Sequence, residues 1–333
     1  MTFLPAPHGW IILDKPHGLG STQAVAAVKR NLREAGYGKK VKVGHGGTLD
    51  PLASGVLPVA LGEATKLAGR MLDATKAYEF TVRFGEETDT LDLEGAVIAS
   101  SDVRPTLDQI IAVLPRFTGP IEQVPPAYSA LKVDGERAYD LARAGQDVVL
   151  QSRSVTVFGL SPFPFRGGAG GGGCPPTLRP VDAPHPNPSP DGEGLENVTF
   201  RATVSKGTYI RSLARDIAHA LGTCGTVTML RRVKAGPFDL SNAISLDKLN
   251  EIGKGAPLEQ ILLPLEAGLD DIPAIDLSPE QARAVRQGRV LTGLPHDDGL
   301  WFARTGTMPV ALIELSGGDA RVVRGFNLPD VAE

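Results

Sequence analysis

Apolar and polar residues alternate along several short segments of this chain, which is the pattern of a half-buried strand. Residues 78–84 show it most clearly, because the aromatic or aliphatic residues Tyr78, Phe80, Val82 and Phe84 are separated by polar ones. A continuous apolar run over residues 11–13 predicts the end of another, more buried strand. Further strands are predicted at residues 97–99, 154–160, 198–204 and 227–233.

Helical spacing of apolar residues separates these strands. Ser21 and Thr22 are good N-caps for an amphipathic helix that runs to about residue 32. Gly222 closes a helix predicted from residue 208. Other helices are predicted over residues 107–114, 136–144 and 246–252. Helices and strands that alternate in this way predict an α/β (α+β) protein.

Two segments depart from this pattern. Residues 161–197 contain a run of four glycines and many prolines, so they cannot pack a core, and we expect a flexible surface insertion between two strands. The last part of the chain is β-rich, with one helix near residues 279–287 and strands near residues 301–303, 310–315 and 321–323. We therefore expect a first domain over residues 1–265 and a small C-terminal domain over residues 266–333.

The composition is that of a globular protein, with 42% hydrophobic and 22% charged residues. The sequence shows no signal-peptide pattern, and no apolar run reaches the ~18 residues that a membrane span needs. Cys174 and Cys224 do not suggest a disulfide framework, and no His/Cys cluster has the spacing of a zinc site. We expect a cytoplasmic protein that binds neither a membrane nor a structural metal.

Charge is segregated along the chain although the net charge is only -4. Residues 1–70 hold nine Lys/Arg against four Asp/Glu, and residues 201–234 hold seven against one. Residues 266–333 are acidic, with eleven Asp/Glu against six Arg. A basic stripe on an acidic protein is an electrostatic footprint for nucleic acid. Two solvated faces that happen to be basic would give the same counts, and charge alone leaves both interpretations open.

The segment Gly44-His45-Gly46-Gly47-Thr48-Leu49-Asp50-Pro51 places a carboxylate at the exit of a glycine-rich turn. Glycine permits positive φ and the close approach of another molecule, and Pro51 restricts Asp50 toward an extended conformation. Apolar residues follow, so we expect Asp50 at the border of a core and a cleft, where a nucleophile would be placed. Asp-Pro pairs are also common in ordinary turns and helix caps.

A series of motifs in one order resembles the TruB family of tRNA pseudouridine synthases, over residues 9–250 apart from the insertion. The motifs are residues 13–16, the Asp50 loop, and residues 53–58, 62–66, 76–78, 88–92, 128–132, 205–211 and 230–232. The resemblance implies a pseudouridine synthase fold with a mixed, largely antiparallel sheet. It also implies a PUA-like C-terminal domain, whose RNA binding the acidic charge of residues 266–333 puts in question.

The resemblance implies that uridine 55 in the T-arm of tRNA is converted to pseudouridine. This isomerisation changes neither redox state nor composition, so no cofactor is expected. It needs a carboxylate nucleophile and a group that moves a proton. By resemblance Asp50 is the nucleophile, Arg211 pairs with it, and Asp92 helps to hold Arg211. An opposite charge within a few ångströms keeps a carboxylate ionised. Arg211 could otherwise be an ordinary phosphate contact.

The remaining pocket residues also come from the resemblance. Tyr78 matches a tyrosine that stacks on the flipped base and moves the proton, and Tyr209 matches a second aromatic residue. Leu230 matches an apolar wall, and His45 matches a histidine that fills the space of the flipped nucleotide. From their patterns alone, Tyr78 and Leu230 would be core residues of strands and His45 an inert turn residue.

Residues 119–148 match a thumb-like segment that clamps the tRNA arm. Its basic residues and the basic pair of the last predicted strand are expected to contact phosphates, which position RNA without reading its sequence. These residues are Lys132, Arg137, Arg143, Arg231 and Arg232. Solvated helix charges would explain them as well. Lys15 is expected to support the Asp50 loop, and the protein is expected to be a monomer.

Two other functions stay open at the level of sequence. One is an RNA-guided synthase of the same superfamily, which acts on ribosomal RNA with protein partners and a guide. The other is a tRNA-folding chaperone with incidental catalysis. Activity of the purified protein on tRNA without a guide would distinguish a stand-alone enzyme from the RNA-guided synthase. Rescue of the cellular phenotypes by an inactive Asp50 variant would favour the chaperone.

Overall fold

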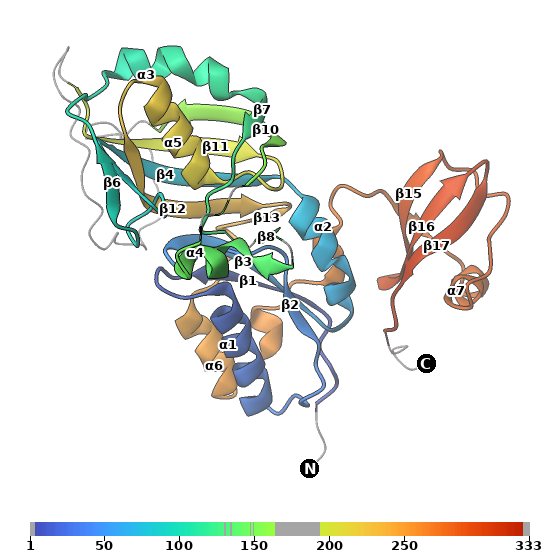
Figure 1. The fold of residues 1–333 in the computed structure, drawn as a ribbon. Coiled ribbons are helices and arrows are strands. Elements are labelled where there is room, and N and C mark those ends of the chain that lie inside the picture. The colour runs from blue at the N-terminus through green and yellow to red at the C-terminus, as the bar shows by residue number, and fades with distance from the viewer. Residues whose placement is uncertain are drawn as a thin grey trace, which may run out of the picture. The chain divides into compact units, whose positions relative to one another are not determined.

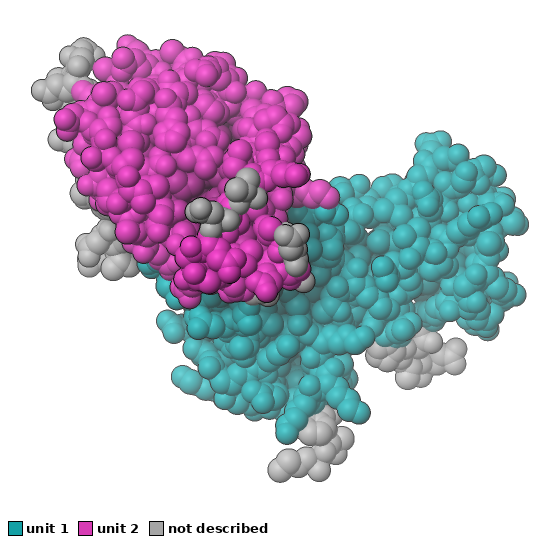
Figure 2. Space-filling view, viewed as in Figure 1, with its two compact units in different colours: residues 1–74, 233–333 teal, residues 75–232 magenta. Residues whose placement is uncertain are grey.

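The computed structural model describes residues 4–129, 131–133, 135–146, 148, 150–163 and 194–328 (Figure 1). The chain divides into two compact units (Figure 2). Unit 1 comprises Met1–Ala74 and Val233–Glu333, and unit 2 comprises Thr75–Arg232. The predicted boundary near residue 265 lies inside unit 1 and stays a prediction about domains.

In unit 1, strands of nearly continuous apolar sequence are buried on both faces, as their composition requires. β1 (Gly9–Lys15) pairs antiparallel with β3 (Ala53–Leu61), and β2 (Val43–His45) pairs antiparallel with β3 as well. Trp10 is fully buried in the unit 1 core and donates its Nε1 hydrogen to the Leu265 carbonyl at 3.0 Å. β13 (Phe238–Asp239) pairs with the end of β12 (Gly225–Ala235).

Two helices of unit 1 that are far apart in the sequence lie side by side (Figure 1). They are α1 (Ser21–Glu34) and α6 (Leu246–Gly253), and Asn31 Nδ2 donates to Asn250 Oδ1 at 3.1 Å between them. The prediction that Ser21 and Thr22 are N-caps is wrong. The helix begins at Ser21 with Gly20 as N-cap, and the Gln23 side chain accepts a hydrogen bond from the Gly20 amide. A short α2 (Ala68–Asp73) follows a 3-10 turn over Gly62–Leu67.

The C-terminal part of unit 1 is a four-stranded sheet in the order β14-β15-β16-β17. The strands are β14 (Ala274–Asp276), β15 (Gly299–Thr305), β16 (Met308–Ser316) and β17 (Asp319–Gly325). β14 runs parallel to β15 and the other pairs are antiparallel. The predicted helix is α7 (Pro279–Arg286), capped by the Ser278 hydroxyl. The β-rich tail is confirmed, and β14 is a strand that alternation did not reveal because it has three residues.

Unit 2 is built on strands in the order β12-β4-β11-β10-β7. They include β4 (Lys76–Phe84), β7 (Gly119–Gln123), β10 (Arg153–Pro162) and β11 (Asn197–Val204). The β4·β11, β10·β11 and β10·β7 pairs are antiparallel. The core contains Phe80, Phe200 and Leu213, to which α5 (Ile210–Ala220) contributes its apolar side. This arrangement confirms the predicted α+β class with largely antiparallel pairing.

Shorter elements complete unit 2. They are β5 (Glu86–Thr88), β6 (Val97–Ser100), α3 (Leu107–Val113), β8 (Lys132–Val133), β9 (Glu136–Arg137) and α4 (Ala138–Arg143). β10 ends at Pro162 and β11 begins at Asn197, so the predicted insertion falls between two strands as expected. Most of that insertion, residues 164–193, lies outside the described residues. Its flexibility therefore stays a prediction.

Candidate active site

The Asp50 loop connects β2 to β3 in unit 1, and its glycines serve different purposes. Gly47 has φ 131°, a conformation that other residues rarely adopt. A Cβ on Gly46 would stand 2.4 Å from Met71 Cβ, so this glycine makes room for the protein's own α2 rather than for another molecule. A Cβ on Gly44 would meet nothing within 4 Å. The expectation that all three glycines open space for a ligand is therefore wrong for Gly46.

The backbone is pinned on both sides of Asp50. Ser21 Oγ accepts from the Leu49 amide at 2.8 Å and donates to the Leu49 carbonyl at 2.9 Å. The Pro51 carbonyl accepts from the Gly18 amide at 2.8 Å and from Lys15 Nζ at 3.3 Å. Leu49 is buried whereas Asp50 keeps partial exposure. The carboxylate is therefore presented at a fixed place on the border of the core.

Lys15 is fully buried, and a buried ammonium group must be satisfied by hydrogen-bond acceptors. Its Nζ donates to the carbonyls of Pro16 at 3.0 Å and Leu19 at 2.6 Å as well as to Pro51. These contacts hold the β1 end and the Asp50 loop together. They are the supporting contacts that the sequence analysis expects of Lys15.

His45 ends β2 opposite Val59 of β3 and is partly exposed. Its Nδ1 accepts a hydrogen bond from the Gly47 amide at 3.3 Å, which places the proton of a neutral ring on Nε2. The ring is thus oriented by the loop that carries Asp50. Its role toward a flipped nucleotide stays a prediction.

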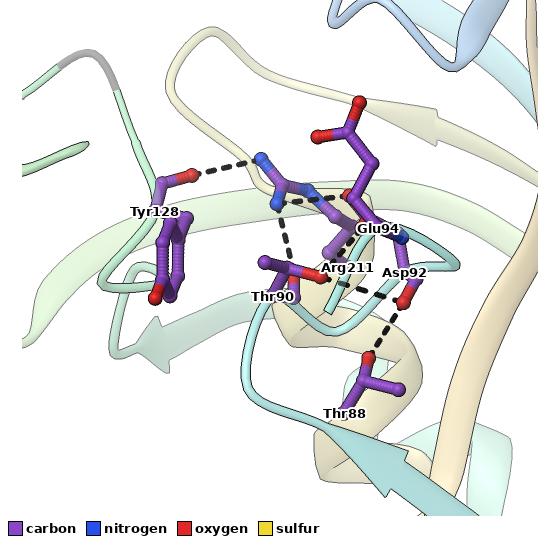
Figure 3. Close-up of polar contacts among 6 residues, drawn as sticks. All are labelled: Thr88, Thr90, Asp92, Glu94, Tyr128 and Arg211. Carbon is purple, nitrogen blue, oxygen red and sulfur yellow. Dashed lines mark hydrogen bonds and ion pairs between the residues drawn. The ribbon is translucent and has the colours of Figure 1, made fainter. Parts of the chain in front are cut away.

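Arg211, in the first turn of α5, is the centre of a buried polar network in unit 2 (Figure 3). Its Nη1 lies 3.1 Å from Asp92 Oδ2, with 8% and 10% of the two side chains exposed. Nη1 also donates to the Thr90 carbonyl at 2.8 Å, and Nη2 donates to the Tyr128 carbonyl at 3.0 Å. The predicted contact of Asp92 with Arg211 is therefore present.

The loop that carries Asp92 is itself constrained. Thr90 Oγ1 donates to Asp92 Oδ1 at 2.6 Å, and the Glu94 amide donates to the same oxygen at 3.0 Å. Leu91 has φ 63°, which is uncommon for a residue with a branched side chain, and its carbonyl accepts from the Val227 amide at 3.1 Å. Such strained positions persist only where the surroundings fix them, and they cluster at functional sites.

Gln123 is a supporting residue that sequence reasoning missed. It is buried at the end of β7, and its amide group pairs in both directions with the backbone of Tyr209. Tyr209 N donates to Oε1 at 2.8 Å, and Nε2 donates to the Tyr209 carbonyl at 3.1 Å. Tyr209 is the N-cap of α5, so Gln123 fixes the start of the helix that carries Arg211. A lone glutamine at a strand end carries no sequence signal for this role.

Two other predicted pocket residues lie on neighbouring strands of unit 2. Tyr78 lies on β4 opposite Ala202 of β11, is partly exposed and packs against the unit 2 core. Leu230 lies on β12, is also partly exposed and packs against the same core. Both keep the exposed surface that a contact with a base would need.

The basic residues expected to contact RNA differ in their exposure. Arg143 is exposed, with its guanidinium carbon 4.4 Å from the ring centre of Tyr139. Arg231 is partly exposed. Arg232 has 1% of its surface exposed, so its guanidinium is not available to a phosphate at the surface, and the predicted phosphate contact does not fit this residue. The side chains of Lys132 and Arg137 lie outside what the structure describes.

The structure places the predicted site residues in two groups, one within each unit. Unit 1 brings together Lys15, His45 and Asp50, and unit 2 carries Tyr78, Asp92, Tyr209, Arg211 and Leu230. The predicted pairing of Asp50 with Arg211 joins residues of different units and stays a prediction. Within the described ranges, no group of three or more His, Cys, Asp or Glu side chains could hold a metal ion. None of the helices described has the length and apolar character required to cross a bilayer.

Sequence profiles of two family domains match the chain. The N-terminal domain of the TruB family pseudouridylate synthases matches residues 33–168, and the C-terminal domain of tRNA pseudouridylate synthase B matches residues 211–270. The tRNA pseudouridine synthase B of Novosphingobium aromaticivorans is 66% identical over 325 residues, which cover 98% of this chain and 99% of that protein. The tRNA pseudouridine synthase B of Zymomonas mobilis is 55% identical over 331 residues, with 98% and 100% covered.

Solved structures of related fold include a chain of a Cbf5-Nop10-Gar1 complex, with a TM-score of 0.66 at 27% identity over 96% of this chain and 85% of that one. A chain of an H/ACA ribonucleoprotein bound to a substrate RNA containing 2'-deoxyuridine has a TM-score of 0.66 at 24% identity, covering 97% and 86%. The latter likeness concerns the fold alone. The near full-length identity to the two relatives confirms the resemblance found in the motifs, and the chain belongs to the TruB family of pseudouridylate synthases.

Proposed function

We propose that this protein isomerises uridine 55 in the T-arm of tRNA to pseudouridine, with Asp50 as the nucleophile. The observation that carries the proposal is the loop that pins Leu49 and Pro51 and leaves Asp50 between them partly exposed. A carboxylate held in this way is placed for attack on a bound uridine. The relatives that share 66% and 55% of its residues are tRNA pseudouridine synthases B, which supports tRNA as the substrate.

Asp50 is proposed to attack the uridine, either at the uracil ring or at C1′ of the ribose. The glycosidic bond breaks, the uracil turns, a carbon–carbon bond to C1′ replaces the carbon–nitrogen bond, and the bond to Asp50 breaks again so that the carboxylate is regenerated. One proton leaves C5 and one is gained at N1, so the reaction balances without a cofactor. Tyr78 is proposed to move a proton and, with Tyr209, to stack on the flipped base. Stacking of this kind contributes about 1–3 kcal/mol per base and offsets part of the unstacking cost.

Arg211 is proposed to face Asp50 and to keep it ionised, because a cation within a few ångströms favours the charged form of a carboxylate. For this task the guanidinium must be held at a fixed place before RNA binds. Asp92 and the carbonyls of Thr90 and Tyr128 hold it from three directions (Figure 3). The network orients Arg211 and partly offsets its charge, which is the arrangement expected of a preorganised site.

The RNA is proposed to lie against the basic segments, with Arg143 and Arg231 as phosphate contacts. Their exposure supports this role. Such contacts position the T-arm without reading its bases. We further propose that the protein acts as a monomer in the cytoplasm, and that the small β-rich C-terminal sheet is a PUA-like domain.

The test uses the purified protein and an unmodified tRNA transcript, without guide RNA or other proteins, and maps pseudouridine by position. The proposal expects modification at position 55. Asp50→Asn keeps the size of the side chain but removes the nucleophile, and the rate is expected to fall by at least about 10³-fold. Asp276→Asn, at an exposed carboxylate of the C-terminal sheet, is the matched control and should keep the parental rate. Turnover by Asp50→Asn at the parental rate would contradict the assignment.

The fold likeness to a chain of a Cbf5-Nop10-Gar1 complex favours a second candidate, an RNA-guided synthase. The identity to that chain is 27%, against 66% to a tRNA pseudouridine synthase B. The same assay decides between the two candidates. No modification of tRNA by the purified protein, together with modification of ribosomal RNA once a guide RNA and partner proteins are added, would favour the guided enzyme.

A further inference from the structure

Tyr128 links the thumb-like segment, residues 119–148, to the arginine of the site. Its carbonyl oxygen accepts the hydrogen bond from Arg211 Nη2 at 3.0 Å (Figure 3). The other acceptors on Arg211, Asp92 and Thr90, come from a different loop of unit 2. The orientation of the guanidinium therefore depends on the place of a segment expected to contact RNA.

The side chain of Tyr128 fixes the position of that carbonyl. Its hydroxyl donates to Asp89 Oδ2 at 3.3 Å, and its ring meets the Tyr139 ring edge-on, with centroids 6.3 Å apart. The next residue is tied to α4 as well, since the Tyr139 amide donates to the Ser129 carbonyl at 3.0 Å. The guanidinium of Arg143 lies over the Tyr139 ring. A continuous path of contacts thus joins the exposed Arg143 to the buried Arg211.

The surroundings of Tyr128 are not arranged for maximal stability. Asp89 Oδ1 and Ser129 Oγ are buried and have no hydrogen-bond partner within the described residues. Unpaired buried polar atoms are costly and rare in folded proteins. Burial, together with the charge of Asp89, raises the pKa of the Tyr128 hydroxyl.

We propose that Tyr128 is a positioning residue that couples the thumb-like segment to the orientation of Arg211. The inference rests on the proposed function, because Tyr128 can position a group of the site only if Arg211 takes part in the reaction. When the segment is in place, the Tyr128 carbonyl completes the set of acceptors around the guanidinium. When the segment is displaced, Arg211 Nη2 loses this acceptor while Asp92 and the Thr90 carbonyl still bind Nη1, so the guanidinium is held less firmly in its working position. RNA contacts at Arg143 would in this way change the orientation of Arg211.

The experiment measures the single-turnover rate on tRNA, the tRNA dissociation constant and the thermal unfolding of each variant. Tyr128→Phe removes the bond to Asp89 and keeps the ring, and its rate should fall about three- to tenfold. Tyr128→Leu removes the ring contacts too and should cost about 100-fold, the effect of a misplaced catalytic group. Both should bind tRNA within about twofold of the parent protein, because the site and not the binding surface is disturbed. Tyr37→Phe, in unit 1, is the control and should match the parent protein.

A second comparison separates this inference from the proposed function. In an Arg211→Lys protein, whose ammonium cannot reproduce the planar fork, adding Tyr128→Leu should cost less than about threefold. If Arg211→Lys alone turns over at the parental rate, the site assignment fails and this inference with it. If the single-turnover rate of Arg211→Lys is reduced but that of Tyr128→Leu is not, only the positioning role is overturned. The same holds if the rate losses of the two single variants multiply in the double variant. Weaker tRNA binding at an unchanged rate would overturn it as well. Should Tyr128→Leu unfold, the Tyr128→Phe rate decides.

Discussion

Two arginine–aspartate pairs, one in each unit, have the same chemistry but differ in burial, and so in the expected effect of breaking them. Arg211 and Asp92 are about nine-tenths buried, whereas Arg304 and Asp276 are 43% and 63% exposed. The exposed pair has the better geometry, with two parallel hydrogen bonds of 2.9 and 3.1 Å. Geometry alone would therefore rank Arg304 and Asp276 first.

Burial reverses that ranking. An exposed ion pair replaces hydration that both groups already had, so it contributes little to the free energy of unfolding. A buried pair gives up that hydration, and each partner then depends on the other and on the surrounding carbonyls. The Arg211 pair is thus a weak source of stability that becomes critical when it is broken. A protein retains such an arrangement most readily where a fixed charge serves a function.

The largest expected effect is that of Arg211→Ala. It leaves the Asp92 carboxylate buried without its cation, and the free energy of unfolding should fall by about 3–5 kcal/mol. The single-turnover rate should fall by about 10²–10³-fold, because a preorganised charge is lost from the site. Chemical denaturation and rate measurements below the unfolding transition check the two values. A variant that keeps both stability and rate would show that the buried pair has no special weight.

Asp92→Asn should have an intermediate effect. The amide oxygen can still accept from Thr90 and from the Glu94 amide, but an NH₂ group now faces Arg211 in place of an anionic oxygen. The free energy of unfolding should fall by about 1–3 kcal/mol. The rate should fall less than in Arg211→Ala, since the guanidinium keeps the carbonyls of Thr90 and Tyr128. A larger rate loss than that of Arg211→Ala would contradict this ordering.

The smallest effect belongs to Arg304→Ala. The hydrogen bond and charge of Arg304 hold the pKa of Asp276 below its ordinary value. A lowered pKa in the folded state contributes stability above the unfolded pKa and loses it as the pH falls. Because Asp276 is exposed, no change in thermal unfolding should be measurable at neutral pH. An NMR titration should show its pKa rise toward the ordinary value. A clear loss of stability would show that exposed pairs in this chain carry more weight than burial predicts.

Much of the fold was predictable because it depends on local pattern. The alternation of residues 78–84 marked β4, and apolar spacing with Gly222 marked α5 within two residues at either end. The prediction at Ser21 failed because the hydroxyl is used elsewhere. Ser21 Oγ bonds the backbone of Leu49, 28 positions away, and Gly20 becomes the N-cap. A capping preference is local, and a long-range hydrogen bond overrides it.

The candidate site was predictable where side chains carry its chemistry and hidden where backbone does. Asp92 beside Arg211 followed from the family motifs, and the structure shows the pair. The carbonyl of Tyr128 and the positive φ of Leu91 leave no mark in the sequence, because any residue has a carbonyl and leucine seldom adopts that φ. Gly46 was misread for a related reason. Its neighbour Met71 is brought close only by the folded chain.

We propose that the buried Arg211 pair serves the reaction and not the fold. The double variant Arg211→Met/Asp92→Leu tests it, because it removes both charges and replaces them with apolar side chains. This variant should unfold at a higher denaturant concentration than Arg211→Ala, while its single-turnover rate on tRNA should stay as low. Recovery of the rate together with stability would show that the reaction does not need the charged pair.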